Sequence, residues 1–252
     1  MSGRQWNANS YDRVGGPMTA MAAAVVDRLD LEGHETVLDA GCGTGRVSEL
    51  LLERLPTGRV IAVDADPDMV RVASEHLAER AQVFRADLLD LTLDEPVDAV
   101  LSTATFHWVL DHQALFHRLF SVLRPGGHLV AQCGGEGNIE DLRAAGDEVA
   151  QLPEFAPHFA GWNPPWYYAN PDQTAERLAA AGFVDVRTWL EPWPVEPEDP
   201  AEYLSTVTLG AQVQRLPDDL APRYVDEVMA RTSGATTVGY IRLNIDARRP
   251  PA

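Results

Sequence analysis

Between residues 36 and 133 the sequence alternates short apolar runs with longer segments of helical periodicity. The short runs predict buried strands, and the segments between them predict helices with one apolar face. Strands that alternate with helices form parallel βαβ units, so we expect an α/β fold with helices on both faces of a mostly parallel sheet. The predicted strands are residues 36–38, 60–63, 82–85, 97–101 and 128–133.

Single residues mark the ends of the predicted helices. Asp66 and Pro67 have the residue types of an N-cap and a first helical position, and the helix that follows keeps an apolar face as far as Leu77. Residues 124–127, Arg-Pro-Gly-Gly, are expected to end the helix before the fifth strand.

The alternation is interrupted twice after residue 133. Residues 134–169 contain the aromatic, proline-rich run GWNPPWYY, and residues 191–232 open with the acidic connector EPWPVEPEDP. A helix at 170–182 and a strand at 184–190 separate them, and the alternation around 241–245 predicts a final antiparallel strand near the sheet edge. The core is therefore assigned to residues 1–133, 170–190 and 233–252, and the cap or substrate-binding insertions to residues 134–169 and 191–232.

Charge and composition disfavour several classes of partner. With 38 acidic and 20 basic residues among 252, and no lysine, the formal charge is −18 at pH 7. Such a chain repels nucleic-acid phosphates and anionic membranes, so neither is an expected partner. The longest apolar run, residues 20–26, is too short to span a bilayer, and residues 1–12 have neither the basic nor the apolar region expected of a leader peptide. Cys42 and Cys133 have no metal-ligand partner at suitable spacing, so we expect a metal-free cytoplasmic protein.

A glycine-rich turn follows the first predicted strand, in the segment VLDAGCGTGRVSELL. Gly41, Gly43 and Gly45 let the backbone come close to a ligand at the N-terminus of a helix, which favours a nucleotide-like ligand. The dinucleotide pattern GxGxxG requires a glycine where Arg46 stands, so NAD is disfavoured.

Acidic residues end the next two strands. Asp64 lies where a carboxylate accepts hydrogen bonds from ribose hydroxyls, and Asp87 lies where it accepts one from an adenine amine, with the Leu88 amide facing a ring nitrogen. Taken singly, the glycines can serve a tight turn and each Asp can cap a helix. Their order at consecutive strand ends of one parallel sheet favours a ligand site.

These segments resemble the motifs of class I S-adenosylmethionine (SAM) methyltransferases: VLDAGCGTG the first, VIAVDAD the second and FRADL the third. The opening WN with Tyr11, the stretch TFHWVLDH, LRPGG and the closing RLNIDARR are similar to the trans-aconitate methyltransferase group. The resemblance implies a Rossmann-like seven-stranded sheet, SAM as cofactor and a small-molecule acceptor.

The resemblance also implies roles for single residues. Asp39 would lie near the methionine end of SAM, Met69 would pack on adenine, and Thr103 would face the methionine moiety through its backbone. Tyr11 would form a lid over the sulfonium, or else pack within an N-terminal helix. The full expected cofactor set is Tyr11, Asp39, Gly41, Gly43, Gly45, Asp64, Ala65, Met69, Asp87, Leu88 and Thr103.

The chemistry of methyl transfer limits what else is needed. A sulfonium donor is already activated, so positioning supplies most of the acceleration; a carboxylate acceptor needs no base, whereas a hydroxyl does. His107 is the candidate catalytic residue, as a general base, as a partner of an acceptor carboxylate, or as a structural histidine. The candidate substrate residues are Trp108, Trp162, Trp166 and Tyr167, with Tyr168 beside them in the same aromatic run. Ordinary cap packing is the alternative for the aromatic run.

The sequence therefore predicts SAM-dependent methylation of a small molecule, most simply O-methylation of a carboxylate or hydroxyl. A SAM-binding protein of this fold that transfers no methyl group, such as a cyclase or a sensor, is the alternative. An RNA or protein methyltransferase is disfavoured by the acidity and the absence of a basic patch.

Overall fold

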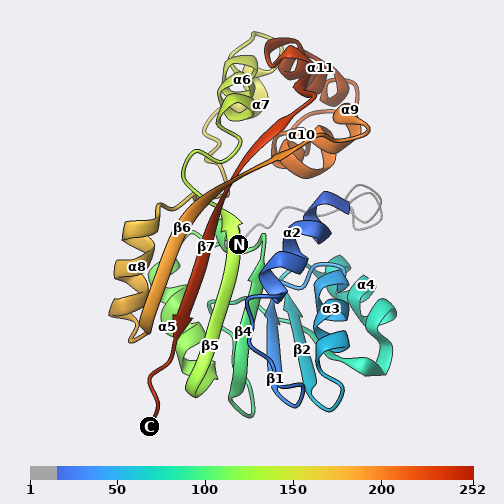
Figure 1. Cartoon of the computed structure of the whole chain (residues 1–252). Coiled ribbons are helices and arrows are strands. Elements are labelled where there is room, and N and C mark those ends of the chain that lie inside the picture. Colours follow the sequence, from blue (N-terminus) through green and yellow to red (C-terminus); the bar gives the residue numbers. More distant parts are fainter. Residues whose placement is uncertain (1–15) are drawn as a thin grey trace.

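The computed structural model describes residues 16–252 and shows a seven-stranded sheet flanked by helices (Figure 1). The strand order is β3-β2-β1-β4-β5-β7-β6. Strands β1 to β5 are parallel, whereas β7 is antiparallel to β5 and β6, which confirms the predicted α/β class. The strands are β1 (Thr36–Ala40), β2 (Arg59–Asp64), β3 (Gln82–Arg85), β4 (Val97–Thr103), β5 (Leu123–Gly134), β6 (Val184–Val195) and β7 (Val238–Arg248).

The position of β7 agrees with the prediction of a final antiparallel strand near the sheet edge, because it lies between β5 and the edge strand β6. The path of the chain explains this. Strand β6 ends in the cap, and β7 starts there and returns beside it (Figure 1), so β7 runs antiparallel and fills the place next to β5. Leu243 and Ile245 are accordingly buried, and β6 is the edge strand.

Two segments that were expected to be irregular belong to strands. Residues 191–195, predicted as connector, extend β6 and pair with residues 238–242. Their prolines are tolerated because an edge strand has a neighbour on one side only. Residues 124–127 form an irregular start of β5, in which Gly126 has φ +81°.

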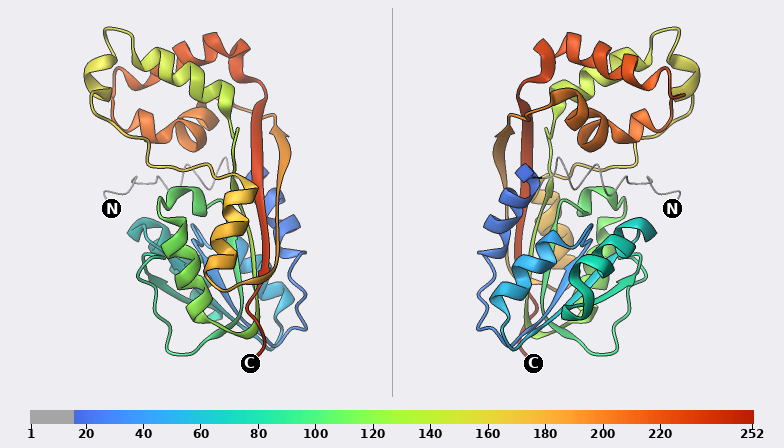
Figure 2. Two further views of the ribbon diagram at one scale, coloured as in Figure 1. Left: turned by 90° about the vertical axis from the view of Figure 1, so that its left-hand side faces the viewer. Right: turned by 90° about the vertical axis from the view of Figure 1, so that its right-hand side faces the viewer.

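Helices cover both faces of the sheet (Figure 2). Asp66 caps α4 as predicted, accepting hydrogen bonds from the N–H groups of Asp68 and Met69, and Pro67 is the first helical residue. Helices α2, α3 and α4 contribute to the apolar cluster on one face, and α5 and α8 to the cluster on the other. These elements are α2 (Gly16–Val26), α3 (Arg46–Arg54), α4 (Pro67–Leu77), the short η1 (Ala78–Arg80) and η2 (Phe106–Trp108), α5 (His112–Val122) and α8 (Pro171–Ala180).

The two inserted segments form a helical cap beyond the carboxyl ends of the parallel strands (Figures 1 and 2). They share an apolar cluster in which Val149 and Phe155 of the first segment meet Tyr203 and Tyr224 of the second, and α6 packs against α11. The cap elements are α6 (Glu140–Ala150), α7 (Ala156–Phe159), α9 (Pro200–Tyr203), the π-helix η3 (Leu204–Thr208), α10 (Gly210–Val213), α11 (Ala221–Arg231) and η4 (Ser233–Ala235).

No helix in the described part of the chain is long and apolar enough to cross a membrane. Within residues 16–252, no cluster of histidine, cysteine and acidic side chains has the arrangement of a metal site. Both cysteines are buried free thiols.

Candidate active site

The glycine-rich turn joins β1 to α3 in a conformation that suits glycine. Gly41 has φ +89°, and a Cβ there would lie 2.2 Å from Thr105 Oγ1. Gly43 has φ +54°, but open space surrounds its missing Cβ, and Gly45 is the N-cap of α3 with φ +88°. The turn therefore packs closely at Gly41 and leaves room at Gly43, where a ligand can approach the backbone.

Asp39, at the end of β1, is fully buried. Ser48 Oγ donates a 2.6 Å hydrogen bond to its Oδ2, while Oδ1 has no hydrogen-bond partner among the described residues. Burial raises the pKa of Asp39 to about 7. A buried carboxylate oxygen without a donor beside a glycine turn fits a ligand that brings its own N–H or O–H groups.

Asp64 is the last residue of β2, and Asp87 follows the end of β3 by two residues. Asp64 Oδ2 accepts from the Gly43 N–H and Oδ1 from the Asp66 N–H, both at 2.9 Å, which ties β2 to the glycine turn. Asp87 Oδ1 accepts from the Leu89 N–H at 3.0 Å. Burial raises the pKa of Asp64. Both carboxylates thus stabilise local turns, and each keeps lone pairs for a ligand.

The structure places the other predicted cofactor residues along the same sheet edge. Met69 and Leu88 are buried, Ala65 is exposed after β2, and Thr103 ends β4. Tyr11 lies outside the described residues. The binding roles of the whole set stay predictions.

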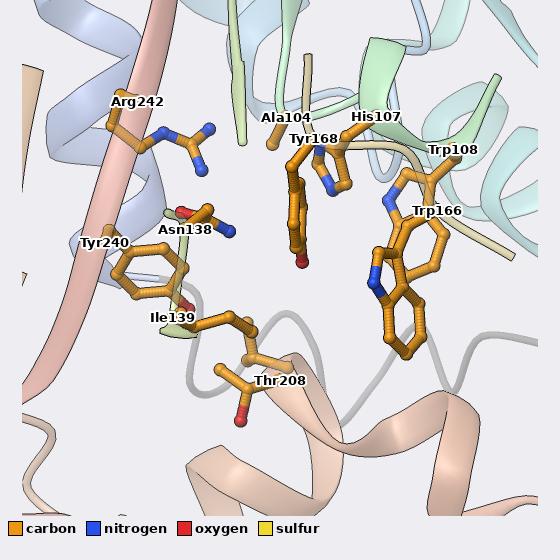
Figure 3. Close-up of a pocket in the computed structure, with 11 residues that line it drawn as sticks. Ala104, His107, Trp108, Asn138, Ile139, Trp166, Tyr168, Thr208, Tyr240 and Arg242 are labelled. Atoms are coloured by element: carbon orange, nitrogen blue, oxygen red, sulfur yellow. The ribbon is translucent and has the colours of Figure 1, made fainter. Parts of the chain in front are cut away.

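A pocket of about 490 Å³, including its open mouth, lies between this sheet edge and the cap (Figure 3). Its walls come from the loop and η2 after β4, the start of the first cap segment, the run before α8, the π-helix and β7. The lining residues are Ala104, His107, Trp108, Asn138, Ile139, Trp166, Tyr168, Val207, Thr208, Tyr240 and Arg242.

His107 is buried, with 8% of its surface exposed, and its ring orientation is fixed by the backbone. The Gly134 N–H donates to His107 Nδ1 at 3.2 Å, so Nε2 carries the proton in the neutral ring. The Tyr167 N–H in turn donates to the His107 carbonyl oxygen at 2.8 Å, which joins η2 to the aromatic run. In that ring form, Nε2 is therefore the nitrogen of His107 that can donate.

Only two of the four predicted substrate residues line the pocket. Trp108 and Trp166 line the pocket, with their ring centroids 6.1 Å apart. Trp162 packs edge-on against Trp166 at 5.7 Å, outside the lining. Tyr167 faces away from the lining: its ring meets His112 and its hydroxyl donates to Gln173 Oε1 at 2.9 Å.

Sequence reasoning missed several lining residues, among them Asn138, Tyr240 and Arg242. One signal was present for Arg242. In RLNID the polar residues Arg242, Asn244 and Asp246 alternate with apolar ones, so they share one face of β7. Nothing local in the sequence shows that this face begins at a pocket.

Comparisons with known proteins identify the family. Residues 37–127 match the family model described as a methyltransferase domain. The chain is 30% identical over 269 aligned residues to trans-aconitate 2-methyltransferase of Delftia acidovorans, covering 98% of this chain and 99% of the relative. The chain belongs to the class I SAM-dependent methyltransferases.

Other relatives agree with this assignment. The methyltransferase is 33% identical over 139 residues to malonyl-[acyl-carrier protein] O-methyltransferase of Acetivibrio thermocellus, covering 54% of this chain and 49% of the relative. Its fold matches phosphoethanolamine N-methyltransferase 2 of Haemonchus contortus, solved with SAM, at a TM-score of 0.64 and 17% identity over 96% of this chain and 56% of that one. The cofactor of the methyltransferase is SAM, and the open space at Gly43 and the unpaired Asp39 oxygen fit it.

Proposed function

We propose that this enzyme transfers the methyl group of SAM to a carboxylate oxygen of a small-molecule acid. The observation that supports it is that the part of the pocket lining which the structure describes offers no general base. Among the described lining residues there is no Asp or Glu, and the single imidazole, His107, has its Nδ1 engaged by the Gly134 N–H. Its Nε2 then donates and does not accept a proton.

The acceptor class follows from this arrangement. A hydroxyl acceptor must lose a proton, and a base within hydrogen-bond reach is needed to take it. A carboxylic acid is already ionised at neutral pH, because its pKa lies near that of Asp or Glu. SAM supplies a methyl group activated by the sulfonium. The residues of the chain need only bind and orient the acid beside it, which supplies about 7 to 11 kcal/mol in well-positioned systems.

We assign the cofactor to the sheet edge formed by β1, β2 and β3. Gly41 and Gly43 would approach the methionyl part, and the unpaired Oδ1 of Asp39 would accept from a donor at that end. Asp64 would accept from the ribose hydroxyls and Asp87 from the adenine amine. Support comes from the position of all three carboxylates at consecutive carboxyl ends of parallel strands, where such sheets bind ligands.

We assign the acid to the pocket under the cap. His107 Nε2 and the Asn138 side chain give it polar partners, and Trp108 and Trp166 supply apolar walls. Two relatives are named for trans-aconitate and malonyl-[acyl-carrier protein], which agrees with an acid as acceptor.

Turnover of matched acceptors tests the proposal. Each carboxylic acid is compared with the alcohol of the same carbon skeleton, and S-adenosylhomocysteine release is measured with the purified enzyme. We expect kcat/KM to favour the acids in every pair. Methylation of the alcohols at equal or higher kcat/KM would overturn the proposal.

Removal of the Asp64 carboxylate tests the cofactor site. Asp64→Ala is expected to weaken S-adenosylhomocysteine binding about 10- to 100-fold, because hydrogen bonds to a charged acceptor contribute about 1.5 to 3 kcal/mol. Asp87→Ala, which removes a single acceptor, should weaken it less, and NAD should not bind the native enzyme. Calorimetry gives the affinities. An unchanged affinity in Asp64→Ala would contradict the ribose assignment.

The buried Asp39 predicts a pH dependence of stability. The pKa of Asp39 is about 7 in the folded chain, whereas the ordinary value, which applies to the unfolded chain, is 3.8. Between these two pH values the folded state keeps a proton that the unfolded state has lost. The contribution of Asp39 to stability therefore decreases as pH rises from about 4 to 7, by up to roughly 4 kcal/mol. Asp39→Asn removes this loss while keeping the shape of the side chain.

Thermal unfolding measures the effect. The melting temperature of Asp39→Asn relative to the native enzyme is expected to increase between about pH 5 and pH 8. Ser48→Ala is the control for loss of the hydrogen bond between Ser48 and Asp39. It removes that bond but keeps the Asp39 carboxyl group, which can still gain and lose a proton. If the melting temperatures of Asp39→Asn and the native enzyme changed in parallel with pH, a raised pKa of Asp39 would be refuted.

A further inference from the structure

The Arg242 guanidinium lies in the pocket wall, and none of the acidic side chains in residues 16–252 pairs with it. Arg242 is 97% buried, since only 3% of its surface is exposed. Its Nε has no hydrogen-bond partner, and no described residue forms a hydrogen bond or ion pair with its guanidinium. The guanidinium faces the Tyr240 ring, whose centroid lies 5.7 Å from Cζ. A buried charge without compensation is costly, so an anion is expected to complete the site.

The acidic residues on the same face of the sheet are committed elsewhere. Glu191 lies directly across from Arg242 in the β6–β7 register, yet its Oε2 accepts from Asn244 Nδ2 at 3.1 Å. Asp246, four residues along β7, faces Arg28 and His128 at 3.5 and 3.3 Å. The pocket lining itself contributes no carboxylate within residues 16–252. The anion must therefore come from a ligand.

We infer that Arg242 binds an acidic group of the acceptor other than the carboxylate that is methylated. This rests on the proposed function. Arg242 enters from β7 on one side of the pocket and His107 from η2 on the other, with Tyr168 between them in the view of Figure 3. The two donors are thus placed to hold two separate groups of one molecule.

The chemistry of a guanidinium pair explains why the reacting group is not the one on Arg242. A bidentate pair engages both carboxylate oxygens and neutralises the charge that makes them nucleophilic. A single donor such as His107 Nε2 leaves the second oxygen of the reacting carboxylate for the methyl group. The acceptor is therefore a molecule with at least two acidic groups, and Arg242 determines its specificity.

Steady-state kinetics with matched acids tests this. The probes are dicarboxylic acids of four to six carbons and the monocarboxylic acids of the same length. The native enzyme is expected to show kcat/KM about 10- to 100-fold higher for the diacids, mostly through KM. Arg242→Gln should abolish this preference, and Arg242→Lys, which keeps the charge without the planar fork, should retain part of it. Arg187→Gln is the charge-matched control, since Arg187 is exposed on β6 away from the pocket.

Two further readouts separate recognition from a structural role. Quenching of tryptophan fluorescence, with Trp108 and Trp166 in the lining, reports diacid binding without turnover. The melting temperature of free Arg242→Gln should equal or exceed that of Arg187→Gln, because an uncompensated buried charge does not stabilise the fold. S-adenosylhomocysteine affinity should not change.

The outcomes are distinct. Loss of the diacid preference in Arg242→Gln with a normal melting temperature supports the inference. A native enzyme that methylates acids without preferring diacids, or a preference that survives Arg242→Gln, overturns it while the proposed function stands. A lower melting temperature with diacids and monoacids equally impaired makes Arg242 a structural residue and also overturns it. Methylation of alcohols in place of acids would instead refute the proposed function.

Discussion

Gly41→Ala is expected to abolish cofactor binding and to lower the stability of the fold. The new Cβ would lie 2.2 Å from Thr105 Oγ1 at a residue with φ +89°. Left-handed backbone costs an alanine about 1 to 2 kcal/mol and overpacking about 1 to 3 kcal/mol more. A loss of about 3 kcal/mol corresponds to a fall in melting temperature of roughly 6 to 12 °C for a chain of this size. Thermal unfolding and calorimetry with S-adenosylhomocysteine measure the two effects.

Gly43→Ala is the matched control for that loss. Gly43 belongs to the same turn and has φ +54°, but among the described residues, its two chain neighbours aside, no atom lies within 4 Å of its missing Cβ. The alanine should therefore cost stability only about 1 kcal/mol or slightly more, while the methyl group fills the space assigned to the cofactor. We expect near-normal melting with at least tenfold weaker S-adenosylhomocysteine binding. Native affinity in Gly43→Ala would show that the turn does not contact the cofactor.

Substitution of His107 has the second large expected effect. His107→Ala removes the Nε2 donor and should lower kcat/KM for the acid about 10- to 100-fold, mainly by raising KM. His107→Gln should lower it by less than about tenfold, because the Gln amide nitrogen can donate from a position close to that of Nε2. The measurement is steady-state kinetics of both variants, in which the acceptor concentration is varied while SAM is kept saturating.

A general base would give a different result. Glutamine cannot take a proton, so both variants would lose about 10²- to 10⁴-fold in kcat. A normal KM with such a collapse of kcat would contradict the assignment of His107 as a donor. Unchanged kinetic constants in both variants would reduce His107 to a packing residue.

The part of the site that could be predicted from sequence depends on short-range patterns. The turn Gly41 to Gly45 and the strand ends at Asp64 and Asp87 lie within three consecutive βα units, where spacing along the chain fixes position at the sheet edge. The Asp66 cap of α4 depends on two N–H groups within three residues. Such features need no knowledge of tertiary structure.

The acceptor pocket could not be predicted in the same way, because it joins residues that are far apart in the chain. Ala104, Asn138, Thr208 and Arg242 meet only because the cap closes above the sheet and β7 inserts between β5 and β6. The π-helix that brings Thr208 to the lining depends on an irregular hydrogen bond from the Leu209 N–H to the Leu204 oxygen, for which the sequence has no signature. Tyr167, a conspicuous aromatic in the sequence, turns away from the pocket, while its neighbour Tyr168 lines it.

The central claim is that the methyl group goes to a carboxylate without help from a protein base. A hydroxy acid offers both acceptors on one skeleton, and the position of a labelled methyl group from SAM can be read from the alkali lability of the product. From the proposed function we expect a methyl ester, which releases the label on alkaline hydrolysis. A product that keeps its label under alkali, as an ether does, would contradict it.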